Sequence, residues 1–148
     1  MQKSQRIKSL VDLNAAQEKN ALEAIADVQK KYLAAQAQLA QLQQYQSEYD
    51  GKLASLGNAG LSLTRLLEFR SFIAKLDLAV QEQHRALSVI ENELHLKRKI
   101  WENLHHRTNS LQKVCDAAKA TELKWQDKRE QSEQDERAAR TNRSPPRD

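Results

Sequence analysis

A glycine-containing break, Gly57-Asn58-Ala59-Gly60, separates two long segments that share one hydrophobic repeat. On both sides of the break, apolar residues recur in alternating steps of four and three, which places them on one stripe of a helix. In the first segment they are Ile7, Val11, Ala21, Ile25, Val28, Tyr32, Ala35, Leu39, Leu42, Tyr49, Leu53 and Leu56. In the second they are Leu66, Phe69, Ile73, Leu76, Val80, Leu87, Ile90, Leu94, Trp101, Leu104, Leu111, Cys115 and Ala118. Two such stripes joined by a turn predict a chain that folds back and pairs with itself.

The repeat predicts an all-α fold, a long antiparallel two-helix coiled-coil hairpin that forms a single domain over residues 1–148. The expected parts are a first helix at about 4–56, a turn at 57–62, a second helix at about 63–143 and a disordered tail at 144–148. The composition agrees, because the chain has only 3 Gly and 2 Pro among 148 residues and is rich in good helix formers.

The helix ends carry weaker signals. Ser4 is a candidate N-cap for the first helix, and Ser62 or Thr64 for the second. Gly57 is expected to end the first helix in the left-handed conformation. The two prolines after Ser144 end any helix.

A turn at this break pairs residues whose numbers add to about 122, so that the two stripes face each other. This register places Ala21 opposite Trp101, a small residue against a large one. It also places Asn14 opposite Thr108, a polar layer of the kind that fixes register in coiled coils.

Four further polar residues fall on the stripes. Glu18 is expected to reach Arg107. No partner on the facing stripe is expected for Gln46, Gln83 and Lys97, which we expect to tilt toward water. The second helix is expected to continue past the start of the first, as a single charged helix after about residue 119.

The charge pattern argues against nucleic-acid binding, and the cysteine content gives one candidate buried residue. The 24 basic and 20 acidic residues give a net charge of +4, and the signs are well mixed along the chain. Nucleic-acid binding is therefore not expected, because such proteins concentrate their basic groups. Cys115 is the single cysteine and is expected to be a small buried hydrophobic residue.

Catalysis is not expected either. The chain has no phosphate-binding glycine loop, no nucleophile motif and no pair of histidines at helical metal-binding spacing, so we expect no enzyme and no cofactor. It also lacks a signal peptide and a stretch of about 20 apolar residues, which favours a cytoplasmic protein without direct membrane insertion.

An apolar surplus at the start of the second helix is the strongest functional signal. Phe72 and Ala79 lie beside the stripe residue Leu76 and widen it on one flank. Two interpretations remain open: an exposed patch that docks a partner, or a broadened stripe packed on the first helix near Gln46 and Leu42. Trp125 is a second candidate, because it lies beyond the paired region and suits insertion into a partner.

The order of three motifs resembles the flagellar export protein FliJ family. They are Tyr45-Gln46-x-Glu48-Tyr49, the turn at Gly60, and Phe72-Ile73-x-x-Leu76-Asp77-x-Ala79-Val80, followed by a segment around Trp101. The resemblance covers nearly the whole chain, including its length, its turn and its charged C-terminal helix.

The resemblance implies a stalk-like coiled coil of the flagellar type III export apparatus, at the cytoplasmic face of the inner membrane. It implies three kinds of partner: the hexameric export ATPase, the transmembrane export gate protein and the flagellar export chaperones. The gate-binding patch of the family falls on Phe72, Leu76, Ala79 and Gln83, of which the last is histidine in the family pattern. The terminal helices are implied to enter the ATPase ring, which makes Trp125 a candidate contact with that ring.

Two alternatives are left open by the sequence. One is the equivalent stalk of a virulence-type secretion system. The other is a homodimeric structural scaffold in which the break at Gly57 is only a kink, whereas the hairpin reading predicts a monomer.

Overall fold

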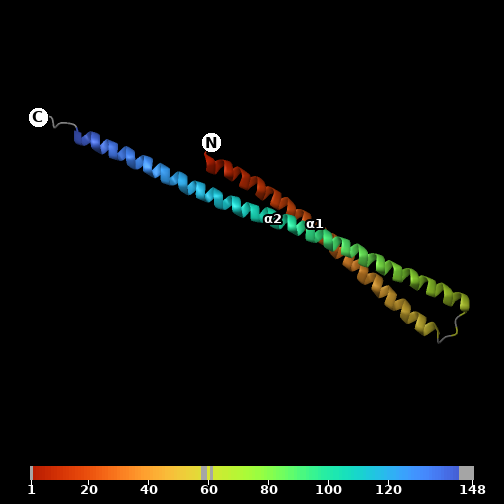
Figure 1. The fold of residues 1–148 in the computed structure, drawn as a ribbon. Helices are drawn as coiled ribbons and strands as arrows, with labels where there is room; N and C mark the ends of the chain where they lie inside the picture. Colours follow the sequence, from red (N-terminus) through yellow and green to blue (C-terminus); the bar gives the residue numbers. More distant parts are fainter. Residues whose placement is uncertain (1, 58–59, 61, 144–148) are drawn as a thin grey trace. The chain divides into compact units, whose positions relative to one another are not determined.

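Two long helices make up the computed structural model, which describes residues 2–57, 60 and 62–143. They are α1 (Lys3–Gly57) and α2 (Leu63–Arg143), packed against each other as a hairpin (Figure 1). The all-α two-helix fold is confirmed, and the alternative in which the break is only a kink is wrong. The predicted disordered tail at 144–148 lies outside the described residues, as do positions 58, 59 and 61 of the predicted turn.

The chain divides into two compact units, each of which contains a segment of α1 and a segment of α2. The terminal unit is Met1–Glu18 with Glu102–Asp148, and the turn unit is Lys19–Trp101. A single domain over the whole chain stays a prediction.

In the turn unit, burial follows the predicted heptad. Its buried apolar residues are Val28, Ala35, Leu39, Val80 and Leu94, all on the two predicted stripes. Ala21 and Trp101 are both half-buried, as their place on the stripes requires. Burying such stripes, rather than intrinsic propensity, provides most of the stability of paired helices.

The terminal unit continues the same pattern with more polar residues. Val11 and Cys115 are buried here together with two polar residues, Ser4 and Asn14. Asn14 contacts Thr108, as the predicted register requires. Cys115 is 1% exposed, which confirms its prediction as a buried residue.

The helix ends differ in part from expectation. Ser62 caps α2, because its Oγ accepts the Arg65 amide at 3.4 Å and its carbonyl accepts the Leu66 amide at 3.1 Å. Ser4 is not an N-cap, since α1 begins one residue before it. The glycine with positive φ is Gly60, at 74°, and not Gly57, which is the last residue of α1. Glycine suits this position because it has no Cβ to clash in the left-handed region.

Candidate partner-binding site

The predicted apolar patch lies in the turn unit, near the start of α2. Phe72 packs its ring on Tyr49 of α1, with centroids 4.7 Å apart, and Tyr49 also contacts Phe69 at 5.5 Å. Phe72 nevertheless remains 43% exposed. Part of this ring therefore completes the helix pairing, while the rest is exposed to solvent. The docking of a partner at Phe72 stays a prediction.

The other three predicted patch residues are half-buried. Leu76 lies on the α2 stripe, and Ala79 lies one heptad after Phe72, on the same side of the helix. Gln83 does not tilt toward water, because its Nε2 donates to the Ala35 carbonyl at 3.0 Å. Its amide is thus engaged with α1, which leaves Phe72 as the most exposed of the four.

A hollow adjoins the patch. It has a volume of about 450 Å³ and is lined by Tyr49, Leu56, Arg65, Glu68, Phe69 and Phe72. The Nζ of Lys52 lies 5.1 Å from the centre of the Tyr49 ring. This end of the turn unit therefore offers an aromatic surface with charged groups at its rim, a composition typical of protein docking sites.

The opposite flank of the turn unit is polar. Gln46 Nε2 donates to Asp77 Oδ1 at 2.5 Å, so Gln46 also does not tilt toward water as predicted. Tyr32 donates its hydroxyl proton to Glu91 Oε1 at 3.3 Å. Burial and the neighbouring Glu91 carboxylate raise the pKa of the Tyr32 hydroxyl. Lys97, the third residue expected to tilt outward, is half-buried.

We define the flank with Phe72 and Ala79 as the apolar flank, and the flank with Asp77 and Glu91 as the polar flank.

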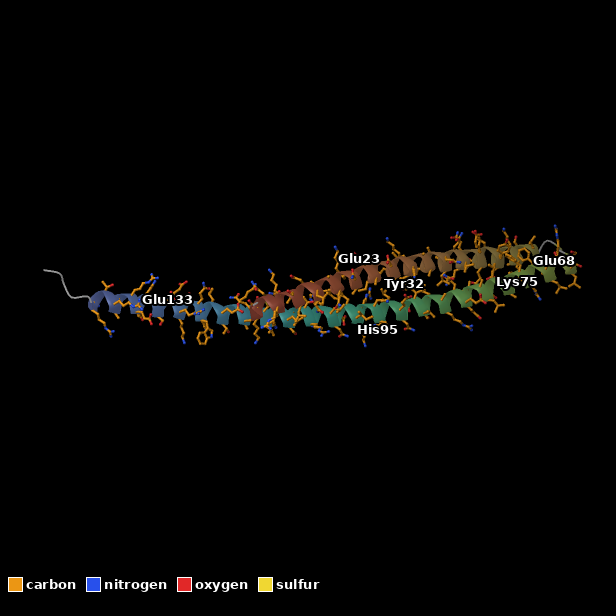
Figure 2. The ribbon with its side chains drawn as sticks, turned by 90° about the horizontal axis from the view of Figure 1, so that it is seen from above. Glu23, Tyr32, Glu68, Lys75, His95 and Glu133 are labelled. Carbon is orange, nitrogen blue, oxygen red and sulfur yellow. The ribbon has the colours of Figure 1, made fainter. Side chains whose placement is uncertain are left out.

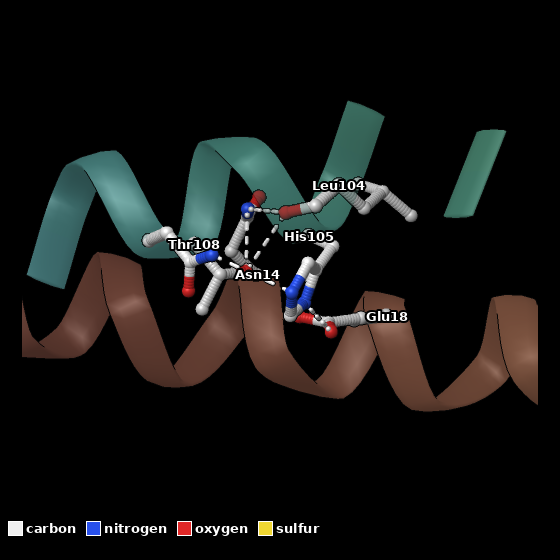
Figure 3. Close-up of polar contacts among 6 residues, drawn as sticks. Asn14, Glu18, Leu104, His105 and Thr108 are labelled. Carbon is white, nitrogen blue, oxygen red and sulfur yellow. Dashed lines mark hydrogen bonds and ion pairs between the residues drawn. The ribbon is translucent and has the colours of Figure 1, made fainter. Parts of the chain in front are cut away.

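A cluster of polar side chains crosses between the helices of the terminal unit (Figure 3). Asn14 Nδ2 donates to Thr108 Oγ1 at 3.1 Å and to the Leu104 carbonyl at 3.2 Å. One turn along α1, Glu18 Oε1 lies 2.6 Å from His105 Nδ1. The partner predicted for Glu18 was Arg107, and this is wrong, because His105 lies on the side of α2 that faces Glu18.

The start of α1 is held by a residue of α2. Glu122 accepts the Ser4 amide at 3.1 Å and the Ser4 hydroxyl at 2.6 Å. The hydrogen bonds from the Ser4 side chain and backbone lower the pKa of this carboxyl. The first turn of α1 has no acidic residue of its own, so Glu122 supplies the negative charge that a helix N-terminus favours.

The second predicted contact residue, Trp125, lies just past this point. It is 65% exposed, and every described residue from 123 to 143 is also exposed. Figure 2 shows this stretch of α2, with Glu133 labelled on it. The predicted single charged helix is therefore present, and Trp125 is available to a partner.

Two observations bear on other kinds of function. In the part of the chain that the structure describes, no group of three or more His, Cys, Asp or Glu side chains is arranged to hold a metal ion. No described helix has the length and apolar character needed to cross a membrane.

Sequence reasoning missed two contributors to these surfaces. A register of about 122 places Tyr49 opposite Ile73, but the Tyr49 ring contacts Phe69 and Phe72. The predicted register was sufficient to find the Phe72 contact, because 49 and 72 add to nearly 122. His105 was not predicted as a partner of Glu18, although its position beside the α2 stripe places it near that residue.

The comparisons with known proteins agree with the motifs. The family described as flagellar FliJ protein matches residues 2–147 of this chain. The flagellar FliJ protein of Salmonella typhi is 26% identical over 135 residues, which cover 90% of this chain and 91% of that protein. No solved structure matches. A match over nearly the whole sequence, together with the two-helix hairpin, shows that this chain belongs to the FliJ family of flagellar export components.

Proposed function

We propose that this chain is the coiled-coil stalk of a flagellar type III export apparatus, needed for flagellum assembly and motility. It binds and stimulates the hexameric export ATPase, contacts the transmembrane export gate protein, and helps to recycle the export chaperones. It acts at the cytoplasmic face of the inner membrane, at the flagellar base. The observation that carries the proposal is that one chain of the FliJ family exposes two unlike surfaces, one in each unit.

The first surface is the single-helix stretch of α2 after Glu122. Its exposed side chains carry both signs of charge, among them Lys124, Asp127 and Arg129. Mixed charges allow many polar contacts with the inner wall of a protein ring, and Trp125 supplies a large apolar anchor among them. We therefore assign this stretch to the export ATPase.

The second surface is the patch of Phe72, Leu76, Ala79 and Gln83. Its exposed aromatic ring beside a hollow suits a protein contact, because buried aromatic residues carry much of the energy of interfaces. We assign this patch to the export gate.

Stimulation of the ATPase tests the first assignment. Stoichiometric amounts of the purified chain are added to the purified export ATPase, and phosphate release and ring assembly are measured. Both are expected to increase. An unchanged rate together with unchanged assembly sinks the stalk function.

Binding to the cytoplasmic part of the gate protein tests the second assignment. Phe72→Ala with Leu76→Ala is expected to weaken this binding, while ATPase stimulation stays at the level of the unmodified chain. Leu67→Ala is the matched control, because Leu67 is also exposed on α2 but lies outside the patch. Equal binding by all three proteins contradicts the assignment.

The family match favours a flagellar apparatus over a virulence-type system. Neighbouring flagellar genes on the chromosome are expected, and neighbouring needle-complex genes would reverse this choice.

A further inference from the structure

On the polar flank of the turn unit, α1 carries a second uncharged stripe beside the one that pairs with α2. Its members follow alternating steps of four and three: Leu22, Ala26, Gln29, Leu33, Gln36 and Ala40. Leu33 is 63% exposed, and Leu22 is exposed as well. This spacing is the one by which helices pair along their length. The stripe therefore has the pattern of a seam for a third helix, and within the described residues no helix covers it.

The surface along this stripe is hollowed, in one place against α2 and in another on α1 alone. One hollow of about 580 Å³ is lined by Gln29, Tyr32, Leu33, Glu91, Leu94, His95 and Arg98. A second, of about 530 Å³, adjoins it at Leu33 and continues along α1 past Ala37 and Ala40 to Gln43. In Figure 2, Tyr32 of α1 and His95 of α2 are labelled close to the same level of the turn unit. The two hollows share Leu33 and together form a groove that follows the second stripe from Gln29 to Ala40.

The charges of this groove are unequal on its two sides. The α1 side is uncharged along the stripe. On the α2 side the Glu91 carboxylate accepts the Tyr32 hydroxyl, while Arg98, among the described residues, has no hydrogen-bond or ion-pair partner. His95 lies beside Arg98 and is exposed. A cation and a histidine along one edge of an apolar groove are complementary to carboxylates on the ligand.

We propose that this groove binds an amphipathic helix of another protein, one that combines an apolar stripe with an acidic flank. Its apolar side chains lie between Leu22, Leu33 and Leu94, and its carboxylates face Arg98 and His95. This site goes beyond the proposed stalk function. It lies on the polar flank, whereas Phe72 and Ala79 lie on the apolar flank, so both sites are available at once.

The charges favour a foreign helix over a second copy of this chain. In a symmetric dimer the same surface meets itself. A second copy would bring its own uncharged stripe and its own Arg98 to the contact, and the carboxylate that it would bring from the groove lining, Glu91, already accepts the Tyr32 hydroxyl.

A synthetic peptide tests the proposal directly. The stripe extends for roughly 27 Å at 1.5 Å per residue, so the probe is a fluorescein-labelled helical peptide of about 18 residues. It carries leucines in steps of three and four, with glutamates on both flanks of the leucine stripe. A second peptide has lysine in place of each glutamate. Binding to the full chain is measured by fluorescence anisotropy at low salt.

The acidic peptide is expected to bind, and the lysine peptide is not. Leu33→Glu and Arg98→Glu are each expected to weaken binding of the acidic peptide at least about tenfold, equivalent to about 1.4 kcal/mol. Leu96→Glu is the matched control, because Leu96 is 61% exposed at the same level of α2 but on another face. It is expected to bind like the unmodified chain. Circular dichroism verifies that each variant remains helical.

Three results would overturn the proposal. The first is equal binding of the two peptides. The second is an equal loss of binding in Leu96→Glu and Leu33→Glu. The third is a dimer in sedimentation that Leu33→Glu converts to monomer, which would assign the groove to a second copy of the chain.

Discussion

Asn14 of α1 holds Thr108 of α2 through a hydrogen bond of 3.1 Å between Asn14 Nδ2 and Thr108 Oγ1. Thr108 in turn donates its hydroxyl proton to the Leu104 carbonyl at 2.9 Å, which also accepts from Asn14. These bonds pair the Asn14 and Thr108 side chains with each other and with the Leu104 carbonyl between the two helices. A polar layer of this kind reduces stability but fixes register.

Replacing both residues with leucine tests this role. Asn14→Leu with Thr108→Leu is expected to leave the melting temperature unchanged or raise it, because both polar partners are removed together. The register is expected to become less well defined. Spin labels at Lys8 and Lys119 report it by their distance distribution, which should broaden in the double variant. A lower melting temperature with a single sharp distance would argue against this role.

The contact between Glu122 and Ser4 predicts a pH dependence at the start of α1. The pKa of Glu122 is lowered from 4.5 in the folded state, so its contribution is present above 4.5 and is lost as the pH falls through the lower folded value. The amide signal of Ser4 in NMR spectra is expected to titrate with a midpoint below 4.5. Glu122→Gln should abolish this titration, and Glu130→Gln should not. A midpoint at or above that of an ordinary glutamate would show that the contact does not form in solution.

Phe72 packs on Tyr49 but remains partly exposed. Truncation of its side chain is therefore expected to lower the stability of the folded chain only to a limited extent. Phe72→Ala is expected to reduce the free energy of unfolding by about 0.5–1.5 kcal/mol for the lost ring contact with Tyr49. A double-mutant cycle with Tyr49→Ala, measured by urea unfolding, isolates this contact. A collapse of thermal stability would instead mean that Phe72 acts chiefly within the helix pair and not in docking.

Burial of Cys115 predicts an inert thiol. Its Sγ lies 3.6 Å from the Ser4 carbonyl and is shielded from solvent. Labelling by a thiol reagent such as DTNB is expected to be slow in buffer and fast in denaturant. Cys115→Leu should cost about 1–3 kcal/mol through overpacking, whereas Cys115→Ala, the smaller replacement, tests for a cavity. Rapid labelling of the folded chain is the contrary result.

Trp125 is expected to contribute to ATPase stimulation and not to folding. Trp125→Ala should reduce stimulation and leave the melting temperature unchanged, because the side chain is largely exposed. Val89→Ala is the control for truncation of an exposed side chain, because Val89 is also 65% exposed but lies in the turn unit, outside both assigned surfaces. If Trp125→Ala stimulates as well as Val89→Ala, Trp125 is not a ring contact.

The pairing of the two helices could be predicted because it rests on a strict repeat. Each predicted stripe position of α1 from Ile7 to Leu56 is at least half-buried, including the polar Glu18 and Gln46. The heptad thus determined which residues lie between the helices, whether apolar or not.

The partners of the polar residues were harder to predict. Gln46, Gln83 and Glu18 bind Asp77, the Ala35 carbonyl and His105, and two of these three groups lie beside the α2 stripe rather than on it. A register counted only from stripe to stripe overlooks such lateral contacts. The position of the left-handed glycine depended on the local path of the turn, which the repeat does not specify.

The contrast between the two flanks of the turn unit has a consequence for how a partner orients on it. A plain two-helix coiled coil looks nearly the same after half a rotation about its long axis. Here that rotation exchanges Phe72 and Ala79 for Asp77 and Glu91, so the turn unit has a distinguishable front and back. A protein that binds the turn unit can therefore discriminate between its two orientations about the long axis.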